Sequence, residues 1–301
     1  MTDAPTVGES RCGLVALVGR PNVGKSTLLN RLVGQKISIV TPRPQTTRHT
    51  VNGVLSVAGA QVVFIDTPGL HEGGKQAINR YMNRAAAGAL ADADIIVVVV
   101  EARKLTEEDE AVFARVATAE APVGLVINKV DRVREKVQLL PFIDALRQRG
   151  EFAFILPVSA ETGEGCELLE QELIARMPVG EQLYPEDQVT NRSMRFIASE
   201  LVREKLMTRL RDEIPYGITV EIERYDEGDS RTDIGAIIWV DRDSHKGIVI
   251  GKGGTMLRDV GSAARQELIR MLDRPVTLKL WVKVREGWAD DENALHRFGY
   301  E

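Results

Sequence analysis

The 301-residue sequence is poor in cysteine and histidine. Its two cysteines, Cys12 and Cys166, lie far apart in the chain and support neither a metal-binding spacing nor a disulfide framework. The four histidines form no cluster in the sequence that could hold a metal. We therefore expect two free thiols in a reducing compartment and no metal site built from cysteine and histidine.

Long apolar stretches are also missing. The longest aliphatic runs, such as 95–100, are far shorter than the roughly 20 residues that span a bilayer. The first ten residues lack the basic segment and apolar core of a secretory signal. We therefore expect a cytoplasmic protein, attached at most to the surface of a membrane.

The net charge of -5 gives the chain no overall basic character. Nucleic-acid-binding proteins usually carry a basic footprint, so the average charge alone argues mildly against that class. The average does not exclude a local basic patch. Hydrophobic residues make up 44% of the chain and charged residues 28%, as in ordinary globular proteins, and the length predicts two domains.

The first part of the chain alternates short, continuous apolar runs with helix-like stretches. Buried strands are predicted at 14–18, 62–65, 95–100, 124–127 and 154–158. Helices are predicted at 26–32, 76–91, 107–117, 136–148 and 166–177. This alternation predicts an α/β fold with a doubly wound, mostly parallel sheet, in which ligands bind beyond the carboxyl ends of the strands.

The pattern changes near residues 177–187, where proline and glycine lie among acidic residues, as in a linker. Beyond it, strands are predicted at 218–225, 234–240, near 247–250 and at 276–285, and helices at 195–211 and 255–272. This pattern is typical of a small α+β domain. We therefore predict a first domain at 1–180, a linker at 181–194 and a second domain at 195–301.

A phosphate-binding loop follows the first predicted strand. The run GRPNVGKS at 19–26 fits the pattern G-x-x-x-x-G-K-[ST] and opens a predicted helix, which is the context that this motif requires. Backbone N–H groups of such a loop converge on phosphate oxygens, and glycines permit the close approach. Lys25 is expected to reach the terminal phosphates, and the Ser26 hydroxyl to bind Mg²⁺. The expected nucleotide contacts of this loop are Gly19, Arg20, Pro21, Asn22, Val23, Gly24, Lys25, Ser26 and Thr27.

A second phosphate-site segment, Asp66-Thr67-Pro68-Gly69, follows the strand predicted at 62–65. A carboxylate at the end of a strand can hold Mg²⁺ through a water molecule, and Gly69 can offer its N–H to the γ-phosphate. A simple Pro-Gly turn would give the same pattern. Leu70, the next residue, is also expected to line the nucleotide site.

Two later segments carry the chemistry of base selection. Asn128-Lys129-Val130-Asp131 follows the strand predicted at 124–127. The Asp131 carboxylate can accept hydrogen bonds from N1–H and the exocyclic amine of guanine, whereas adenine would leave it unpaired. Ser159 and Ala160 follow the last strand of the first domain, where a backbone N–H can meet guanine O6. Alone, the first segment is also compatible with an exposed turn, and the second carries little information.

In this order, each at the carboxyl end of a strand, the four segments resemble the motif set of P-loop GTP-binding proteins. The resemblance implies that a threonine of the loop at 41–49 completes the Mg²⁺ shell, and we favour Thr47 over Thr46. The expected reaction is in-line attack of water on the γ-phosphate, with Lys25, Mg²⁺ and backbone donors such as that of Gly69 stabilising the developing charge.

Leu70 stands where Ras-like proteins carry a glutamine that orients the water, so we expect slow intrinsic turnover and a stimulus from elsewhere. In cation-dependent members of this branch, the asparagine matching Asn22 helps to bind K⁺, and the resemblance implies the same role here. Arg20, Arg43 and Arg48 are weaker candidates for charge stabilisation, because loop arginines are more often solvated.

A candidate nucleic-acid site lies in the second domain. The run GKGG at 251–254 is a G-x-x-G turn before a predicted helix, and such a turn can clamp a nucleic-acid backbone. Alone it is a weak signal, but basic residues surround it. The residues expected to contact RNA are Lys246, Gly251, Lys252, Gly253, Gly254, Arg258 and, on the polar face of the last strand, Lys283.

The order helix, strands, G-x-x-G, helix, strand resembles a type II KH domain, and a P-loop GTPase domain joined to such a module is the layout of the Era GTPases. The resemblance extends from about Gly13 to Tyr300 and includes GRPNVGKSTLLN, QTTRH, DTPGLH, NKVD, VSAETG, VIGKGG and WVKVREGWADDE. It implies binding of GTP and GDP, of the single-stranded 3′ end of small-subunit (16S) ribosomal RNA and of the 30S subunit, and a role in 30S assembly and maturation. It also implies Mg²⁺, K⁺ as an activator and peripheral contact with the inner membrane, and we expect a monomer.

Three alternatives are weaker. A tandem-domain GTPase of ribosome assembly would need a second P-loop motif set, which the sequence lacks. A GTPase that modifies tRNA would place a reactive cysteine near the C-terminus, where this chain ends RFGYE. A GTP-gated RNA-binding scaffold with incidental hydrolysis stays open because of Leu70.

Overall fold

A computed structural model describes residues 10–69 and 76–300. The chain forms two compact units, which are described separately. Within the described ranges, unit 1 comprises 10–38, 47–69 and 82–191, and unit 2 comprises 39–46, 76–81 and 192–300. Two short segments from the first third of the chain thus belong to unit 2. The domain boundaries drawn from the sequence, at 180 and 195, stay a prediction.

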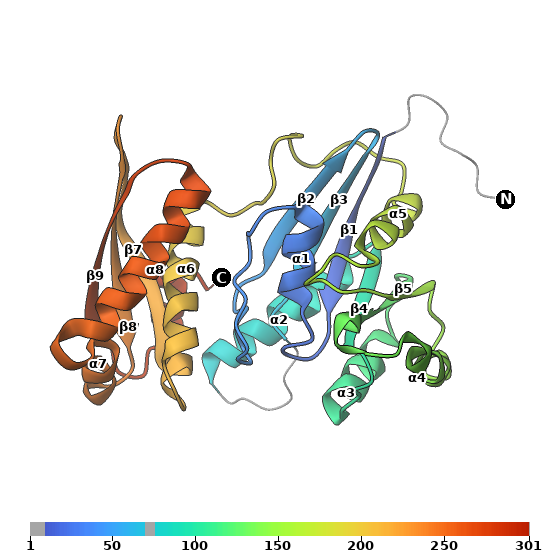
Figure 1. The fold of residues 1–301 in the computed structure, drawn as a ribbon, viewed down its shortest axis with the longest axis horizontal. Helices are drawn as coiled ribbons and strands as arrows, with labels where there is room; N and C mark the ends of the chain where they lie inside the picture. The colour runs from blue at the N-terminus through green and yellow to red at the C-terminus, as the bar shows by residue number, and fades with distance from the viewer. Residues whose placement is uncertain (1–9, 70–75, 301) are drawn as a thin grey trace. The chain divides into compact units, whose positions relative to one another are not determined.

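Unit 1 is built on a six-stranded sheet in the described part of the chain (Figure 1). In order across the sheet, its strands are β2 (Val51–Val57), β3 (Ala60–Asp66), β1 (Arg11–Val18), β4 (Ile95–Glu101), β5 (Val123–Asn128) and β6 (Phe154–Pro157). All neighbours are parallel except β2, which pairs with β3 in the antiparallel direction. The predicted α/β class with a mostly parallel sheet is confirmed.

Helices cover both faces of this sheet. On one face, α1 (Lys25–Val33) and α5 (Cys166–Arg176) pack against β3 and against each other, in front of the strands in Figure 1. On the other, α2 (Ala77–Asp92), α3 (Glu107–Val116) and α4 (Leu139–Arg147) contribute to a shared apolar core. The first six residues of β4 are buried, and each aliphatic side chain buried in this way contributes about 1.5–3 kcal/mol.

The structure differs from the sequence prediction at two elements of unit 1. Strand β2 was not predicted, because Gly53 interrupts its apolar pattern; a Cβ at this position would lie 2.6 Å from Leu29 Cδ1. The helix predicted at 136–148 begins as an α-helix only at Leu139, after a short 3₁₀ turn. Pro141 accounts for this start, since proline is tolerated in the first turn of a helix but not in its interior.

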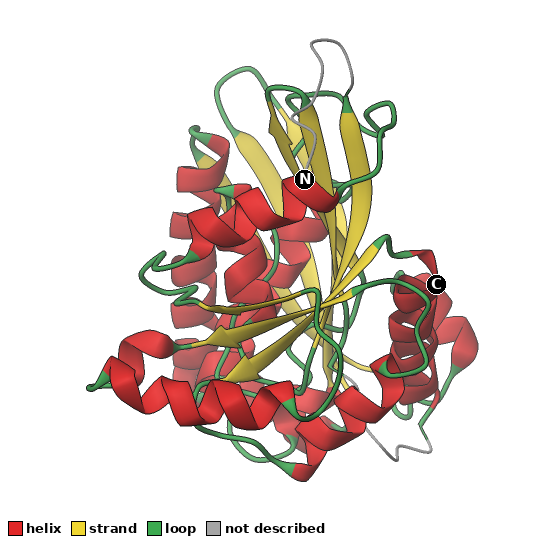
Figure 2. Cartoon of the chain, turned by 90° about the vertical axis from the view of Figure 1, so that its right-hand side faces the viewer, coloured by secondary structure: helices red, strands yellow, loops and turns green. Residues whose placement is uncertain are grey.

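Unit 2 contains a sheet in the order β7 (Ile218–Glu227), β8 (Thr232–Val240) and β9 (Val276–Val284), with β7 and β8 antiparallel and β8 and β9 parallel. Figure 2 distinguishes these strands from the helices by colour. One face of the sheet packs on α6 (Met194–Arg209) and α8 (Thr255–Leu272) around a buried apolar core. The apolar residues of β9 contact this core, whereas Lys279, Trp281 and Lys283 between them are exposed, which confirms the predicted alternation in this part of the strand.

The strand predicted near 247–250 is wrong. These residues end the helix α7 (Asp243–Ile250), in which His245 and Val249, one turn apart, are buried while Ile248 is exposed. A short β-branched run reads as a strand in isolation, but here the helical period decides which side chains are buried. The chain ends with α9 (Glu292–Arg297), which follows the fully buried Trp288.

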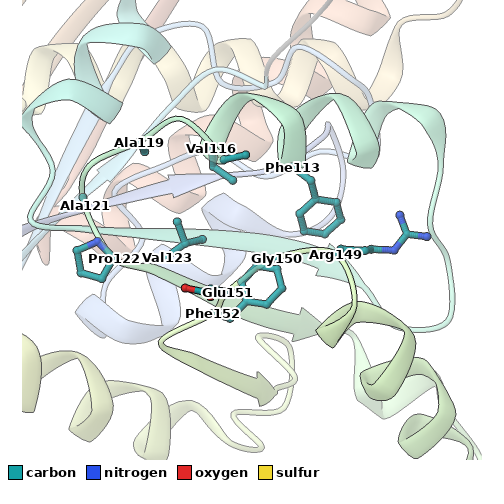
Figure 3. Close-up of a pocket in the computed structure, with 11 residues that line it drawn as sticks. Phe113, Val116, Ala119, Ala121, Pro122, Val123, Arg149, Gly150, Glu151 and Phe152 are labelled. Atoms are coloured by element: carbon teal, nitrogen blue, oxygen red, sulfur yellow. The ribbon is translucent and has the colours of Figure 1, made fainter.

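Among the helices of the described residues, none is both long and apolar enough to cross a membrane. A cavity of about 400 Å³ opens in unit 1 where α3 ends and where β5 and β6 begin. Figure 3 shows Phe113 and Phe152 on its wall, in edge-to-face contact with ring centroids 6.1 Å apart. This cavity lies at the amino-terminal ends of the strands, away from the motif segments, which follow their carboxyl ends.

Candidate functional site

The phosphate-binding loop connects β1 to α1, and two of its positions require glycine. Gly19 has a φ of 153°, and a Cβ there would lie 2.4 Å from the Val99 carbonyl oxygen. Gly24 has a φ of 103°, and a Cβ there would lie 2.3 Å from Asn128 Nδ2. Side chains at these positions would therefore displace the neighbouring strand end or the base segment.

Lys25 is held inside this loop. Its Nζ donates to the carbonyl oxygens of Gly19 at 2.8 Å and Arg20 at 3.1 Å, and only 7% of the residue is exposed. Burial lowers the pKa of Lys25 from 10.5 to about 8, although the nearby Asp66 carboxylate acts in the opposite direction. A polyphosphate would supply negative charge that favours the protonated amine.

Oxygen ligands suited to Mg²⁺ meet at the end of β3. Ser26 Oγ donates to Asp66 Oδ2 at 2.7 Å, and Thr47 Oγ1 lies 2.9 Å from Ser26 Oγ. Ser38 Oγ also donates to Asp66 Oδ2, at 2.9 Å. Asp66 is fully buried, burial raises its pKa, and its Oδ1 has no hydrogen-bond partner among the described residues. A buried carboxylate oxygen without a partner beside two hydroxyls fits a hard divalent cation.

The structure brings Thr47, and not Thr46, to this cluster. Thr46 Oγ1 instead lies 2.6 Å from Thr41 Oγ1 and donates to the Arg43 carbonyl at 2.7 Å. Thr47 Oγ1 also lies 3.4 Å from Asp66 Oδ2. Of the two threonines, Thr47 therefore has the position of a cation ligand.

Asn128 joins the phosphate-binding loop to the two base segments. Its Nδ2 donates to the Val23 carbonyl at 2.8 Å, and its Oδ1 accepts from the Ala160 N–H at 3.0 Å. Ser159 Oγ donates to Asp131 Oδ1 at 2.6 Å, and Asp131 is otherwise exposed. The four segments found in the sequence are thus connected at one edge of the sheet.

The expectation that Arg20 is a solvated loop arginine is wrong. Only 6% of Arg20 is exposed, and its guanidinium bonds to Asp109 at 2.9 Å and Glu101 at 3.1 Å. Lys129 Nζ also lies 3.1 Å from Glu101 and donates to the Asn22 carbonyl at 2.6 Å. Burial raises the pKa of Glu101, but Lys129 and Arg20 outweigh that effect and lower it. These contacts hold the phosphate-binding loop against the end of β4 and the start of α3.

The other two arginines are not solvated either. Arg48 is 1% exposed. Arg43 is half-buried within unit 2, where its Nε donates to the Met207 carbonyl at 2.7 Å and its Nη2 to the Leu210 carbonyl, at the end of α6. The remaining predicted nucleotide contacts lie in the same segments. Pro21, Thr67, Pro68 and Gly69 are in loops, Thr27 is in the first turn of α1, and Val130 begins a short 3₁₀ turn after β5. Leu70 lies outside the described residues.

The G-x-x-G turn of unit 2 links α7 to α8 and presents open backbone. Gly253 and Gly254 have φ values of 62° and 76°, and a Cβ at either would meet no atom within 4 Å. Gly251 is enclosed instead, since a Cβ there would lie 2.8 Å from Met256 Cβ. Lys252 is exposed at the turn, so another backbone can approach a site that carries positive charge.

The basic residues predicted for this site divide between two places. Arg258 is exposed in the first turn of α8, and Lys246 is half-buried on α7. Lys283 lies on the opposite face of the sheet from these helices, with its Nζ 5.8 Å from the centroid of the Trp239 ring. The structure therefore does not bring Lys283 to the turn.

Comparisons with known proteins match both domains of the chain. A family model described as 50S ribosome-binding GTPase matches residues 14–129, and a KH domain model matches residues 213–289. GTPase Era of Xanthomonas oryzae pv. oryzae (strain MAFF 311018) is 51% identical over 296 residues, which cover 98% of this chain and 99% of that protein. The chain belongs to the Era GTPase family. It is therefore a GTPase, with a P-loop GTPase domain followed by a KH domain.

Two solved Era structures are similar along nearly the whole chain. One is a single-residue variant of Aquifex aeolicus Era bound to GDP·AlF₄⁻, with a TM-score of 0.93, 40% identity and coverage of 96% of this chain and 99% of that one. The other is Era in complex with MgGDPNP and nucleotides 1506–1542 of 16S ribosomal RNA, with a TM-score of 0.93, 40% identity and coverage of 97% and 99%.

Two side chains at the nucleotide site of this Era-family chain were missed from the sequence. Ser38, which bonds to Asp66, lies in a loop without a motif. Arg31 bonds to the carbonyl oxygens of Ala160 and Glu161, which follow it by 129 and 130 residues. The only local signal was a basic residue in the last turn of a helix, and such residues are common there.

Proposed function

We propose that this Era-family GTPase couples GTP hydrolysis to binding of the single-stranded 3′ end of small-subunit rRNA, during assembly and maturation of the 30S subunit. One observation carries the proposal. The same chain contains a candidate nucleotide site, with a cluster of oxygen ligands suited to a cation, and an open, basic G-x-x-G turn. The similar Era complex with MgGDPNP and 16S rRNA nucleotides supports it.

At the nucleotide site, Ser26, Thr47 and Asp66 would hold Mg²⁺, which when bound neutralises charge on the phosphates. Lys25 would donate to the terminal phosphate oxygens and stabilise their charge in the transition state. Gly69 would add a backbone N–H. Asn22, exposed in the loop with a φ of 63°, is the proposed contributor to a K⁺ site.

At the base site, the Asp131 carboxylate would accept from N1–H and the exocyclic amine of guanine. The Ser159 hydroxyl, which donates to Asp131 Oδ1, would hold the carboxylate in place. A base without these donors would leave the carboxylate without its partners, so selection of guanine follows.

In unit 2, the G-x-x-G turn would clamp the RNA backbone. Gly253 and Gly254 leave space for its approach, and Lys252 and Arg258 supply exposed positive charge. Such contacts position the strand, and base edges or stacking supply sequence preference. Contact with a membrane surface remains a prediction from the resemblance, and the monomeric state remains a separate prediction.

The coupling would use the loop that ends at Thr47. Residues 39–46 belong to unit 2, where Val40 N–H donates to Glu204 Oε1 at 2.9 Å, Arg43 bonds to the end of α6, and Arg203 Nη2 donates to the Thr46 carbonyl at 2.5 Å. Since Thr47 follows directly, ordering of Thr47 by Mg²⁺ and GTP would act on a segment bonded to α6. GTP would thereby favour the state that holds RNA, and hydrolysis would release it.

Linkage gives the test. RNA must increase the affinity for a GTP analogue, relative to that for GDP, by a certain factor. Linkage requires that the analogue-bound protein bind RNA more tightly than the GDP-bound protein by the same factor. We expect Gly253→Asp to abolish RNA binding and Arg43→Ala to preserve each binding step while reducing that factor. Arg209→Ala, at an exposed arginine of the same helix, serves as the control. If RNA leaves the affinities for the analogue and for GDP unchanged in the wild type, the coupling does not exist.

A further inference from the structure

The last turn of α1 carries an arginine that reaches the base-binding loop. Arg31 Nε donates to the Ala160 carbonyl at 3.1 Å, and its Nη2 donates to the Glu161 carbonyl. Both acceptors directly follow Ser159, in the loop between β6 and α5. The first turn of the same helix carries Lys25, so α1 spans the site from the phosphate end to the base end.

The Ala160 residue is held from two sides. Its N–H donates to Asn128 Oδ1, at the end of β5, and its carbonyl accepts from Arg31. The rest of the loop closes on itself, since the Gly163 N–H donates to the Ser159 carbonyl and the Ser159 N–H to the Glu164 carbonyl, both at 2.8 Å. Besides these internal bonds, the orientation of Ala160 depends on one contact from β5 and one from α1.

A basic residue in the last turn of a helix commonly interacts with the carbonyl end of that helix. In Arg31 the Nε and Nη2 donors instead cross to another loop. The guanidinium also lies close to Gly163, further along the same loop, because a Cβ added to Gly163 would be 3.8 Å from Arg31 Nη1. Arg31 is exposed, so its replacement opens no core, and its effect on binding can be separated from an effect on folding.

We propose that Arg31 is a positioning residue for guanine recognition. By holding the carbonyl oxygens of Ala160 and Glu161, it orients the backbone N–H groups of this loop toward guanine O6. The inference rests on the proposed assignment of Ser159 and Ala160 to the O6 side of the base. It predicts that the contribution of Arg31 to affinity depends on O6 and not on the phosphates.

The test compares diphosphates that differ at one position of the base. Arg31→Met keeps an unbranched side chain similar to the aliphatic stem of arginine and removes its donors, and Arg31→Lys keeps a single donor group. With two hydrogen bonds to neutral carbonyls lost at an exposed site, GDP should bind about three- to tenfold more weakly to Arg31→Met. Inosine diphosphate, which keeps O6 and lacks the exocyclic amine, should lose the same factor, and Arg31→Lys should fall between the wild type and Arg31→Met.

The deciding ligand is 6-thioguanosine diphosphate, in which a weak sulfur acceptor replaces O6. Its affinity should fall less than about twofold in Arg31→Met, since the contact that Arg31 positions is already weakened. Arg176→Met, at an arginine that bonds to Glu172 one turn away in α5, should change no affinity. Single-turnover hydrolysis of GTP by this control variant, Arg176→Met, should match that of the wild type.

Three results would overturn the proposal. An equal loss for all three nucleotides would make Arg31 a general support of the fold, and no loss for any would remove its role. If the wild type itself binds GDP and 6-thioguanosine diphosphate equally, the assignment of the loop to O6 fails and the proposal fails with it. Thermal unfolding of each variant distinguishes these outcomes from misfolding.

Discussion

Lys25 gives nucleotide binding a measurable dependence on pH. Its pKa falls from 10.5 to about 8 in the nucleotide-free protein, because burial disfavours the charged form. A pKa lowered by this amount corresponds to roughly 3 kcal/mol against the ammonium. A bound polyphosphate restores the favourable charge, so binding of GDP should take up about half a proton at pH 8 and about 0.9 of a proton at pH 9.

The same shift fixes the direction of the stability change. Between pH 8 and pH 10.5 the unfolded chain binds more protons at Lys25 than the folded chain does. The unfavourable contribution of this lysine to stability is therefore fully present below pH 8 and disappears as the pH rises toward 10.5. Nucleotide binding should remove most of that dependence, since it holds the lysine protonated.

Isothermal titration of GDP at pH 8, in two buffers that differ in ionisation enthalpy, counts the protons taken up. Lys25→Arg is the matched control, because a guanidinium stays charged at every pH used and should take up none at this site. GMP, which lacks the β-phosphate, should give a smaller count with the wild type. Equal counts for GDP with the wild type and with Lys25→Arg would refute the assigned role of Lys25.

Three further predictions concern the neighbouring residues. Asp131→Asn should weaken GTP binding and favour xanthine nucleotides, because the amide can donate where the carboxylate only accepts; unchanged guanine selectivity in competition binding would remove Asp131 from the base site. Arg20→Met should lower the free energy of unfolding by about 3 kcal/mol, since it leaves the buried Asp109 without its ion-pair partner, and urea unfolding should show partial recovery when Asp109→Asn is added. Gly24→Ala should abolish tight GDP binding because its Cβ would lie 2.3 Å from Asn128 Nδ2, and an unchanged GDP affinity by titration would contradict that geometry.

Much of the fold could be predicted from local patterns. The continuous apolar run of β4 has the pattern of a strand covered on both faces, and the phosphate-binding loop is recognisable from its glycines and its place before α1. The resemblance to a KH domain rested on the order of helix, strands, G-x-x-G turn, helix and strand, in which β9 is the last strand. These features depend on residues that are close together in the chain.

The features that were not predicted from the sequence depend mostly on contacts between residues far apart in the chain. Arg20 was expected to be solvated, because nothing near it in the sequence indicates that Asp109 and Glu101 enclose it. The bonds of Arg31 to Ala160 and of Arg43 to Met207 span more than 120 residues each and follow only from the folded chain. The β-branched end of α7 suggested a strand because a run of three or four residues has no readable period.

The most direct test of coupling between the two domains is single-turnover GTP hydrolysis, measured in K⁺ and in Na⁺ buffers, with and without a short RNA that copies the 3′ end of small-subunit rRNA. We expect the RNA to accelerate hydrolysis in K⁺ and Gly253→Asp to abolish the acceleration while leaving the rate without RNA unchanged. An RNA that binds to the wild type but never changes its rate of hydrolysis would contradict this coupling. The KH domain would then only attach the protein to RNA, and another partner would have to stimulate the GTPase domain.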